Sequence, residues 1–79
     1  MNLYLISQVE NGGYDTYNAA VVAAENEESA RMINPEGEDN WGDKYSGWCK
    51  SPDAVTVNLI GTAAEGIASG VVLSSFNAG

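Results

Sequence analysis

The sequence predicts an α+β fold: one small domain, residues 1–79, with ββαββ order, a four-stranded and mostly antiparallel sheet, one short helix and a long loop that carries both tryptophans. Three observations lead to this prediction. A chain of 79 residues has room for a single domain. Four segments alternate between two sets of side chains with the period of a strand. Between the second and the third of them lies an acidic stretch with the start and stop residues of a helix.

The first two strands are expected to form a hairpin. Residues 3–9 alternate, with leucines and a valine on one side and tyrosine, isoleucine and glutamine on the other. Asn11-Gly12-Gly13 follows, and Asn-Gly favours a tight turn because both residues tolerate positive φ. The second strand covers residues 17–24 and ends in small apolar residues, which would allow a helix or another backbone to pack closely against it.

The helix is expected to begin after Asn26, a good N-cap, with Glu27 and Glu28 in its first turn. It ends at Asn34-Pro35, because proline cannot continue a helix. A helix of about eight residues is about 12 Å long, so it would cover about half of one sheet face. The rest must be covered by the following loop or by a second protomer, and we favour a homodimer or a higher homo-oligomer.

The second half of the chain begins with an irregular stretch over residues 35–53, a loop long enough to bind a ligand or to form its own substructure. Residues 54–62 alternate again and predict the third strand. Glycines at 66 and 70 bracket a turn, and residues 70–76 make the last strand. These two strands are expected to form a second hairpin.

Charge and composition exclude several functions. Eleven acids against three bases give a net charge of −8, there is no histidine, and cysteine occurs once. Nucleic-acid binding depends on cations that neutralise phosphates, so no nucleic-acid partner is expected. A disulfide, a standard zinc set and a Cys-His dyad are absent by count. No apolar run has the length of a membrane span, and the start is unlike a signal peptide. We therefore expect a soluble, intracellular domain with no membrane partner.

The acidic stretch of residues 25–43 holds seven of the eleven acids. It is either a solvated segment that keeps the protein soluble or a phosphate-mimicking face for a nuclease. The calcium-loop and phosphate-loop patterns both fail there, so no metal site is expected. Cys49 lies beside Lys50 but has no histidine to act as its base. We expect a buried free thiol, no enzyme, no catalytic residue and no cofactor.

The aromatic residues indicate ligand binding. Tyrosines follow the first turn, and the tryptophans lie among small polar residues of the long loop, where rings can stack on a planar ligand and polar groups can read its edges. The alternative is that the tryptophans cover the sheet and that the last strand simply ends. The candidate ligand-binding residues are Tyr14, Asp15, Tyr17, Arg31, Trp41, Lys44, Trp48, Phe76 and Asn77.

Five short strings carry a resemblance that spans nearly the whole chain. They are LYLISQ (3–8), GYDTY (13–17), AVVAA (20–24), GVV (70–72) and SFNAG (75–79). In these strings the chain resembles a family of small proteins encoded by tailed phages. The resemblance implies an anti-defence role in the host bacterial cytoplasm, but the motifs name no chemistry.

One group of such proteins sequesters nucleotide-derived messengers, of ADP-ribose type or cyclic nucleotides, which TIR-domain and related defence systems make. These sponges are symmetric oligomers with pockets at subunit interfaces. The class alone is carried over, and no binding residue is transferred. The expected function is thus non-catalytic capture of such a signal. The alternative is an acidic inhibitor that binds a host defence nuclease or sensor through residues 25–43.

Overall fold

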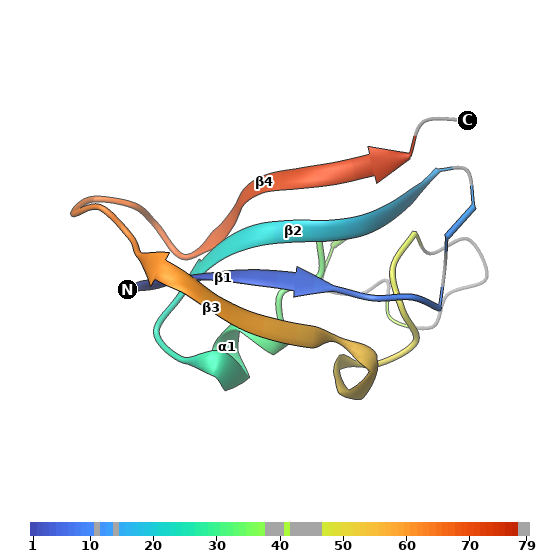
Figure 1. Ribbon diagram of the computed structural model, residues 1–79, viewed down its shortest axis with the longest axis horizontal. Helices are drawn as coiled ribbons and strands as arrows, with labels where there is room; N and C mark the ends of the chain where they lie inside the picture. The colour runs from blue at the N-terminus through green and yellow to red at the C-terminus, as the bar shows by residue number, and fades with distance from the viewer. Residues whose placement is uncertain (11, 14, 38–40, 42–46, 78–79) are drawn as a thin grey trace.

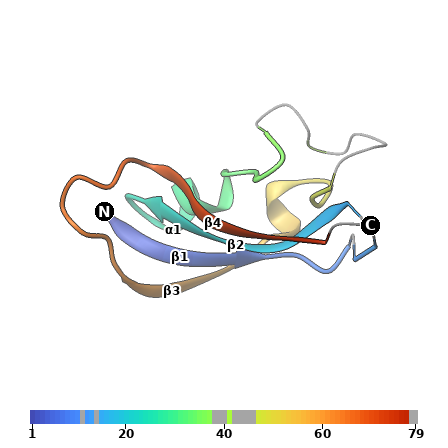
Figure 2. The same cartoon turned by 90° about the horizontal axis from the view of Figure 1, so that it is seen from above.

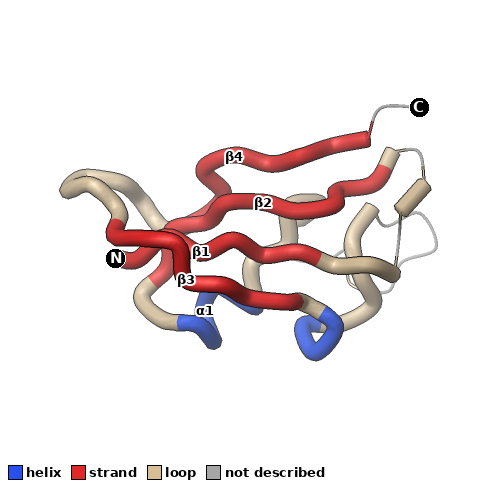
Figure 3. Tube along the Cα trace, in the orientation of Figure 1, coloured by secondary structure: helices blue, strands red, loops and turns tan. Residues whose placement is uncertain are grey.

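The computed structural model describes residues 1–10, 12–13, 15–37, 41 and 47–77. The described residues form four strands, one α-helix and one 3-10 turn, whose arrangement is drawn in Figures 1 and 3. In chain order they are β1 (Asn2–Ser7), β2 (Thr16–Ala24), α1 (Glu27–Arg31), η1 (Pro52–Ala54), β3 (Thr56–Thr62) and β4 (Gly70–Asn77). The predicted α+β class and ββαββ order are confirmed. The helix has five residues, fewer than the eight expected.

The four strands form one sheet in the order β3-β1-β2-β4, and each neighbouring pair is antiparallel. The first predicted hairpin is its centre, where Leu5 of β1 lies opposite Val21 of β2. The second predicted hairpin is wrong, because β3 pairs with β1 while β4 pairs with β2. Figure 1 shows the intervening chain, residues 63–69, turning around one end of the sheet. It must cross three strand spacings, about 14 Å.

Two glycines allow the chain to turn in the connection between β3 and β4, which we call the crossing. Gly66 has a φ of 90° and Gly70 a φ of 132°, in a region that side chains with a Cβ rarely adopt. The Ala63 N–H donates to the Met1 carbonyl at 3.0 Å. The crossing therefore begins tied to the first residue of the chain, beside the central hairpin.

One face of the sheet carries the core. α1 packs against β1, β2 and β3, and Figure 2 shows α1 and η1 on the same side of the sheet. Beyond the short helix, the segment at Trp48 and Cys49 covers this face, and both side chains are fully buried. The buried core comprises Tyr4, Ile6, Ala20, Val22, Ala24, Ala30, Trp48, Cys49 and Val55.

Local sequence explains why α1 forms here. The Asn26 side chain accepts a hydrogen bond from the Ser29 N–H at 2.8 Å, as an N-cap does. Arg31 in the last turn forms an ion pair with Glu27 at 3.3 Å. Ala30 is fully buried in the core with Ala24 of β2, so the small residues noted in the sequence bring helix and sheet close together.

We call the other side of the sheet the open face, because α1 and η1 lie on the opposite side in Figure 2. Residues paired directly across neighbouring strands share a face, so the register identifies its members. They are Leu3, Leu5, Ser7, Thr16, Ala19, Val21, Ala23, Thr56, Asn58, Gly61, Gly70, Leu73, Ser75 and Asn77. Among the residues that the structure describes, no helix has the length and apolar character that crossing a membrane requires.

Candidate functional site

Four of the predicted ligand-binding residues meet where β2 begins and β4 ends. Tyr17 lies opposite Phe76, and Thr16 lies opposite Asn77. The Asp15 N–H donates to the Asn77 carbonyl, so the turn before β2 is tied to the end of β4. Asn18 adds a second amide beside that of Asn77. We call Tyr17, Asn18, Phe76 and Asn77 the aromatic–amide cluster.

The two rings of the cluster form a tilted pair. The centroids of Tyr17 and Phe76 are 4.8 Å apart and their planes are inclined by 53°, which suits the quadrupoles of two aromatic rings. Tyr17 is half-buried and packs against the core. Phe76 remains 47% exposed. The ring of Tyr17, which packs on the core, therefore supports the ring of Phe76, which faces solvent.

The two amides bond to each other and to the strand beside them. Asn77 Nδ2 donates to Asn18 Oδ1 at 2.9 Å, and Asn18 Nδ2 donates to Asn77 Oδ1 at 3.2 Å. Asn77 Nδ2 also lies 3.4 Å from Thr16 Oγ1. An amide has two N–H donors and two carbonyl lone pairs. Asn18 thus keeps a donor, and both carbonyls keep an acceptor position, for a molecule that reaches this surface.

Close backbone contacts hold the cluster in place. The Tyr17 N–H donates to the Gly47 carbonyl at 2.8 Å, and the Gln8 side chain donates to the Tyr17 carbonyl at 2.8 Å. A Cβ at Gly47 would lie 2.8 Å from the Asp15 carbonyl oxygen, so the backbones approach as closely as only glycine allows. Asp15 itself has a positive φ of 59°.

Sequence reasoning missed Asn18, Gln8 and Gly47. The register shifts between Tyr17 and Ala19, so a β-bulge interrupts the alternation from which faces were assigned. Asn18 consequently meets Asn77 in a way that strict alternation does not show. Gly47 is typical of a loop residue, but nothing in the local sequence indicates which backbone it approaches.

Arg31 belongs to a different part of the molecule. Its guanidinium donates to the carbonyl oxygens of Pro52, at 3.3 Å, and Val55, and it forms the ion pair with Glu27. These contacts fix α1 to η1 on the β3 side of the sheet. The structure therefore does not bring Arg31 together with the cluster, and its donors serve the fold.

The tryptophans do not lie on an exposed surface, as the prediction of ligand binding requires. Trp48 is fully buried in the core, so its indole has no surface on which a ligand could stack, and the alternative of a ring covering the sheet describes it. Trp41 is half-buried and packs against the same core. The remaining predictions, Tyr14 and Lys44, lie outside the described residues.

The acidic stretch is only partly within the described residues. Glu25, Glu27 and Glu28 are exposed at the start of α1, and Glu36 is half-buried. The other three acids, Glu38, Asp39 and Asp43, lie outside the described residues. Among the described residues no group of three or more metal-ligating side chains is present.

Cys49 is a buried thiol. Its side chain is fully buried, and its Sγ donates to the Ser51 carbonyl at 3.4 Å. Burial raises the pKa of the Cys49 thiol, with a further contribution from the negative charge of Glu10. A thiol that keeps its proton is a poor nucleophile, which agrees with the interpretation of Cys49 as a buried free thiol.

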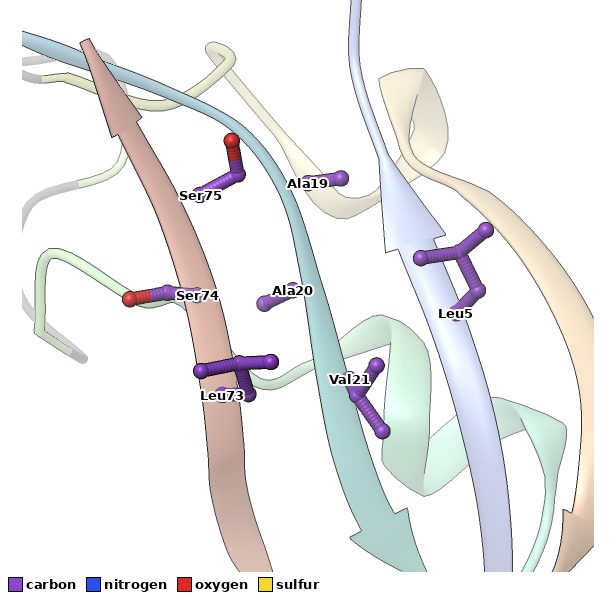
Figure 4. Close-up of a pocket in the computed structure, with 7 residues that line it drawn as sticks. All are labelled: Leu5, Ala19, Ala20, Val21, Leu73, Ser74 and Ser75. Atoms are coloured by element: carbon purple, nitrogen blue, oxygen red, sulfur yellow. The ribbon is translucent and has the colours of Figure 1, made fainter.

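Two hollows lie outside the cluster. One, of about 520 Å³, lies between the end of α1 and the crossing, and is lined by Ser29, Met32, Ile33, Asn34, Gly37, Ser69 and Gly70. There Asn34 Oδ1 accepts from the Glu36 N–H at 2.8 Å, while its Nδ2 has no hydrogen-bond partner. The other, of about 270 Å³, is drawn in Figure 4 and is lined by Leu5, Ala19, Ala20, Val21, Leu73, Ser74 and Ser75.

Comparison with known proteins adds no relative to this description. No protein-family model matches the chain, and neither a curated protein nor a solved structure matches it.

Proposed function

We propose that this chain is a non-catalytic binding protein that sequesters a nucleotide-derived signal of bacterial anti-phage immunity. The ligand is of ADP-ribose type or a cyclic nucleotide, and the protein acts in the host cytoplasm. The observation that carries the proposal is the aromatic–amide cluster, in which the end of β4 presents an exposed phenyl ring on one face of the sheet and, at the next residue, an amide that bonds to Asn18. The resemblance to small phage proteins supplies the biological setting.

The cluster has the two kinds of group that recognise a nucleotide. The exposed ring of Phe76 offers a stacking surface, and stacking of one base on an aromatic ring contributes about 1–3 kcal/mol. The amides of Asn18 and Asn77 lie at the same end of β4 but on its other face, where they offer a donor and acceptors to a polar group of the ligand beyond the stacked base. Tyr17 and the core beneath it keep the phenyl ring in place, which reduces the entropy lost on binding.

Charge narrows the class of ligand. The chain carries a net charge of −8, and Asp15 beside the cluster is an exposed carboxylate. A carboxylate can accept hydrogen bonds from ribose hydroxyls, but it repels phosphates. We therefore expect affinity to fall as phosphates are added, so that ADP-ribose binds more tightly than ATP.

Calorimetric titration with ADP-ribose, a cyclic dinucleotide and ATP tests the proposal. Phe76→Leu keeps an apolar side chain but removes the ring, and we expect it to weaken the tightest of these ligands about tenfold, which corresponds to about 1.4 kcal/mol. Val72→Ala, on the same strand and 51% exposed, should bind as the unaltered protein does. Absence of binding to all three ligands at millimolar concentration would refute the proposal, as would full affinity in Phe76→Leu.

A second function is favoured by the exposure of Glu25, Glu27 and Glu28 at the start of α1. Such a face could bind a basic nuclease or sensor of the host defence and act as an acidic inhibitor. Reversing Glu25 and Glu28 to lysine tests this alternative. Loss of nuclease capture together with intact nucleotide binding would favour the inhibitor, whereas unchanged capture would exclude this face.

A further inference from the structure

The open face has no charged side chain. Its fourteen paired residues, drawn from all four strands, are apolar, glycine or polar and neutral, although the chain as a whole carries a charge of −8. Leucines at 3, 5 and 73 and Val21 form its apolar part, and the neutral polar residues Thr56, Asn58, Ser7 and Ser75 flank it. An apolar centre with a polar rim is the anatomy of a protein interface.

The shape of this face provides both a projection and a recess. Leu73 is 69% exposed at the edge strand β4. The hollow of about 270 Å³ beside it runs over β2, where Ala19 leaves space next to the longer side chains of Leu5 and Val21 (Figure 4). The hollow is open to solvent, so a leucine side chain of a second molecule can lie in it against Ala19.

We propose that the open face binds the open face of a second copy of this chain. The absence of charge on this face favours a second copy as its partner. A basic protein would gain no electrostatic attraction from a surface without charge. Two copies with a net charge of −8 each repel one another least where the contacting surfaces carry no charge. The projecting Leu73 and the recess that would receive it lie on the same face. In a two-fold dimer each Leu73 can enter the recess of the other protomer, because an isologous interface uses one patch twice.

The size of the face sets the expected strength of the dimer. Four strands at about 4.8 Å and six residues at about 3.4 Å give a plane of roughly 400 Å² per protomer, against about 800 Å² in a standard interface. The buried core on the other face is formed by residues of one protomer. We therefore expect folded monomers that dimerise reversibly, with a dissociation constant in the micromolar range.

This dimer leaves the ring pair of the aromatic–amide cluster accessible. Tyr17 packs toward the core, and Phe76 contacts Tyr17, so both rings lie on the covered side of the sheet. Asn77 follows Phe76 directly in β4 and therefore lies toward the open face, but beyond Ser75 and outside the recess that would receive Leu73. The dimer contact and the proposed stacking ring thus use different residues. A monomeric variant that still binds nucleotide would show that the two properties are separate.

Sedimentation velocity from 1 to 200 µM tests the dimer, with Leu73→Asp as the disrupting variant. Leu59→Asp is the matched control, because Leu59 is a leucine of the other edge strand with 64% exposure and lies opposite Tyr4 on the covered face. We expect concentration-dependent dimers in the unaltered protein and in Leu59→Asp, and monomers throughout in Leu73→Asp. Circular dichroism should show all three folded, since both leucines are exposed.

A second variant distinguishes face packing from pairing of two β4 edges. Ala19→Glu places a charge in the recess on the central strand β2, whose backbone already pairs on both sides. It should abolish the dimer. Dimers that persist in Ala19→Glu but not in Leu73→Asp would place the contact at the edge and overturn the proposal, as would an unaltered protein that is monomeric at 200 µM.

Discussion

Asn18 and Asn77 bind each other through their side-chain amides, each donating to the oxygen of the other, at 3.2 and 2.9 Å. The two residues are 59 positions apart in the chain. Their contact fixes the end of β4 against the start of β2. It thereby also holds Phe76, the residue before Asn77, in its exposed position. It is the only reciprocal pair of amide hydrogen bonds among the described residues.

Asn77→Ala should weaken nucleotide binding at least tenfold, because it removes one amide directly and releases the other from its fixed orientation. The free energy of unfolding should fall by only about 1 kcal/mol, the net contribution of an ordinary hydrogen bond. Titration and urea unfolding measure the two quantities. Asn58→Ala, an exposed asparagine on β3, is the control and should leave affinity unchanged. If Asn77→Ala and Asn58→Ala bind nucleotide with equal affinity, the amides do not take part in binding.

Arg31→Ala should act on stability and not on binding. The guanidinium loses its bonds to the carbonyls of Pro52 and Val55, and hydrogen bonds to a charged group contribute about 1.5–3 kcal/mol. Glu27→Ala removes only the exposed ion pair and should cost less than about 0.5 kcal/mol. A large loss of nucleotide affinity in a still-folded Arg31→Ala protein would instead support the sequence prediction of a ligand-binding arginine.

Gly47→Ala should reduce both stability and nucleotide binding. The added methyl would lie 2.8 Å from the Asp15 carbonyl oxygen and 3.3 Å from Thr16 Cα, so the backbone that leads into β2 must shift. Such overpacking costs about 1–3 kcal/mol. At Gly61, by contrast, a Cβ meets nothing within 4 Å, and Gly61→Ala should be close to neutral. Thermal unfolding and titration of the pair provide the comparison.

The buried thiol should make stability depend on alkaline pH. Because burial raises the pKa of Cys49 in the folded protein, the folded state keeps a proton that the unfolded state loses first. Its contribution to stability is full below the unfolded pKa and is lost as the pH rises through the folded pKa. Urea unfolding between pH 7 and pH 10 should therefore show a steeper decline for the unaltered protein than for Cys49→Ala. Parallel curves would contradict this account.

The sequence predicted the elements well because their signals are local. Asn26 and Pro35 mark the ends of the helical stretch, Asn-Gly marks the first turn, and alternation marks each strand. The five-residue helix is shorter than expected because the backbone after Arg31 turns away at Met32, whose N–H bonds to the Ala30 carbonyl. Arg31, the last residue of the helix, is held by the carbonyls of Pro52 and Val55, which lie more than twenty positions away and give no signal in the sequence around Met32.

Strand order and the make-up of the site depend on long-range contacts. Alternation in residues 54–62 and 70–76 is equally compatible with a second hairpin and with addition to either edge of the first. Only the pairing of Tyr4 with Leu59 and of Val21 with Leu73 decides between them. Likewise, a tryptophan in a polar loop gives no indication that it will be fully buried, as Trp48 is.

The placement of β3 and β4 on opposite edges also bears on how the chain folds. The central hairpin joins neighbouring segments and can form early, but Thr16 and Asn77, which are partners, are separated by 61 positions. Closing so long a loop costs entropy before any pairing rewards it, and sheets of this kind fold over milliseconds to seconds. During synthesis β2 therefore has no partner on one side until β4 has been made, and the aromatic–amide cluster cannot assemble before then.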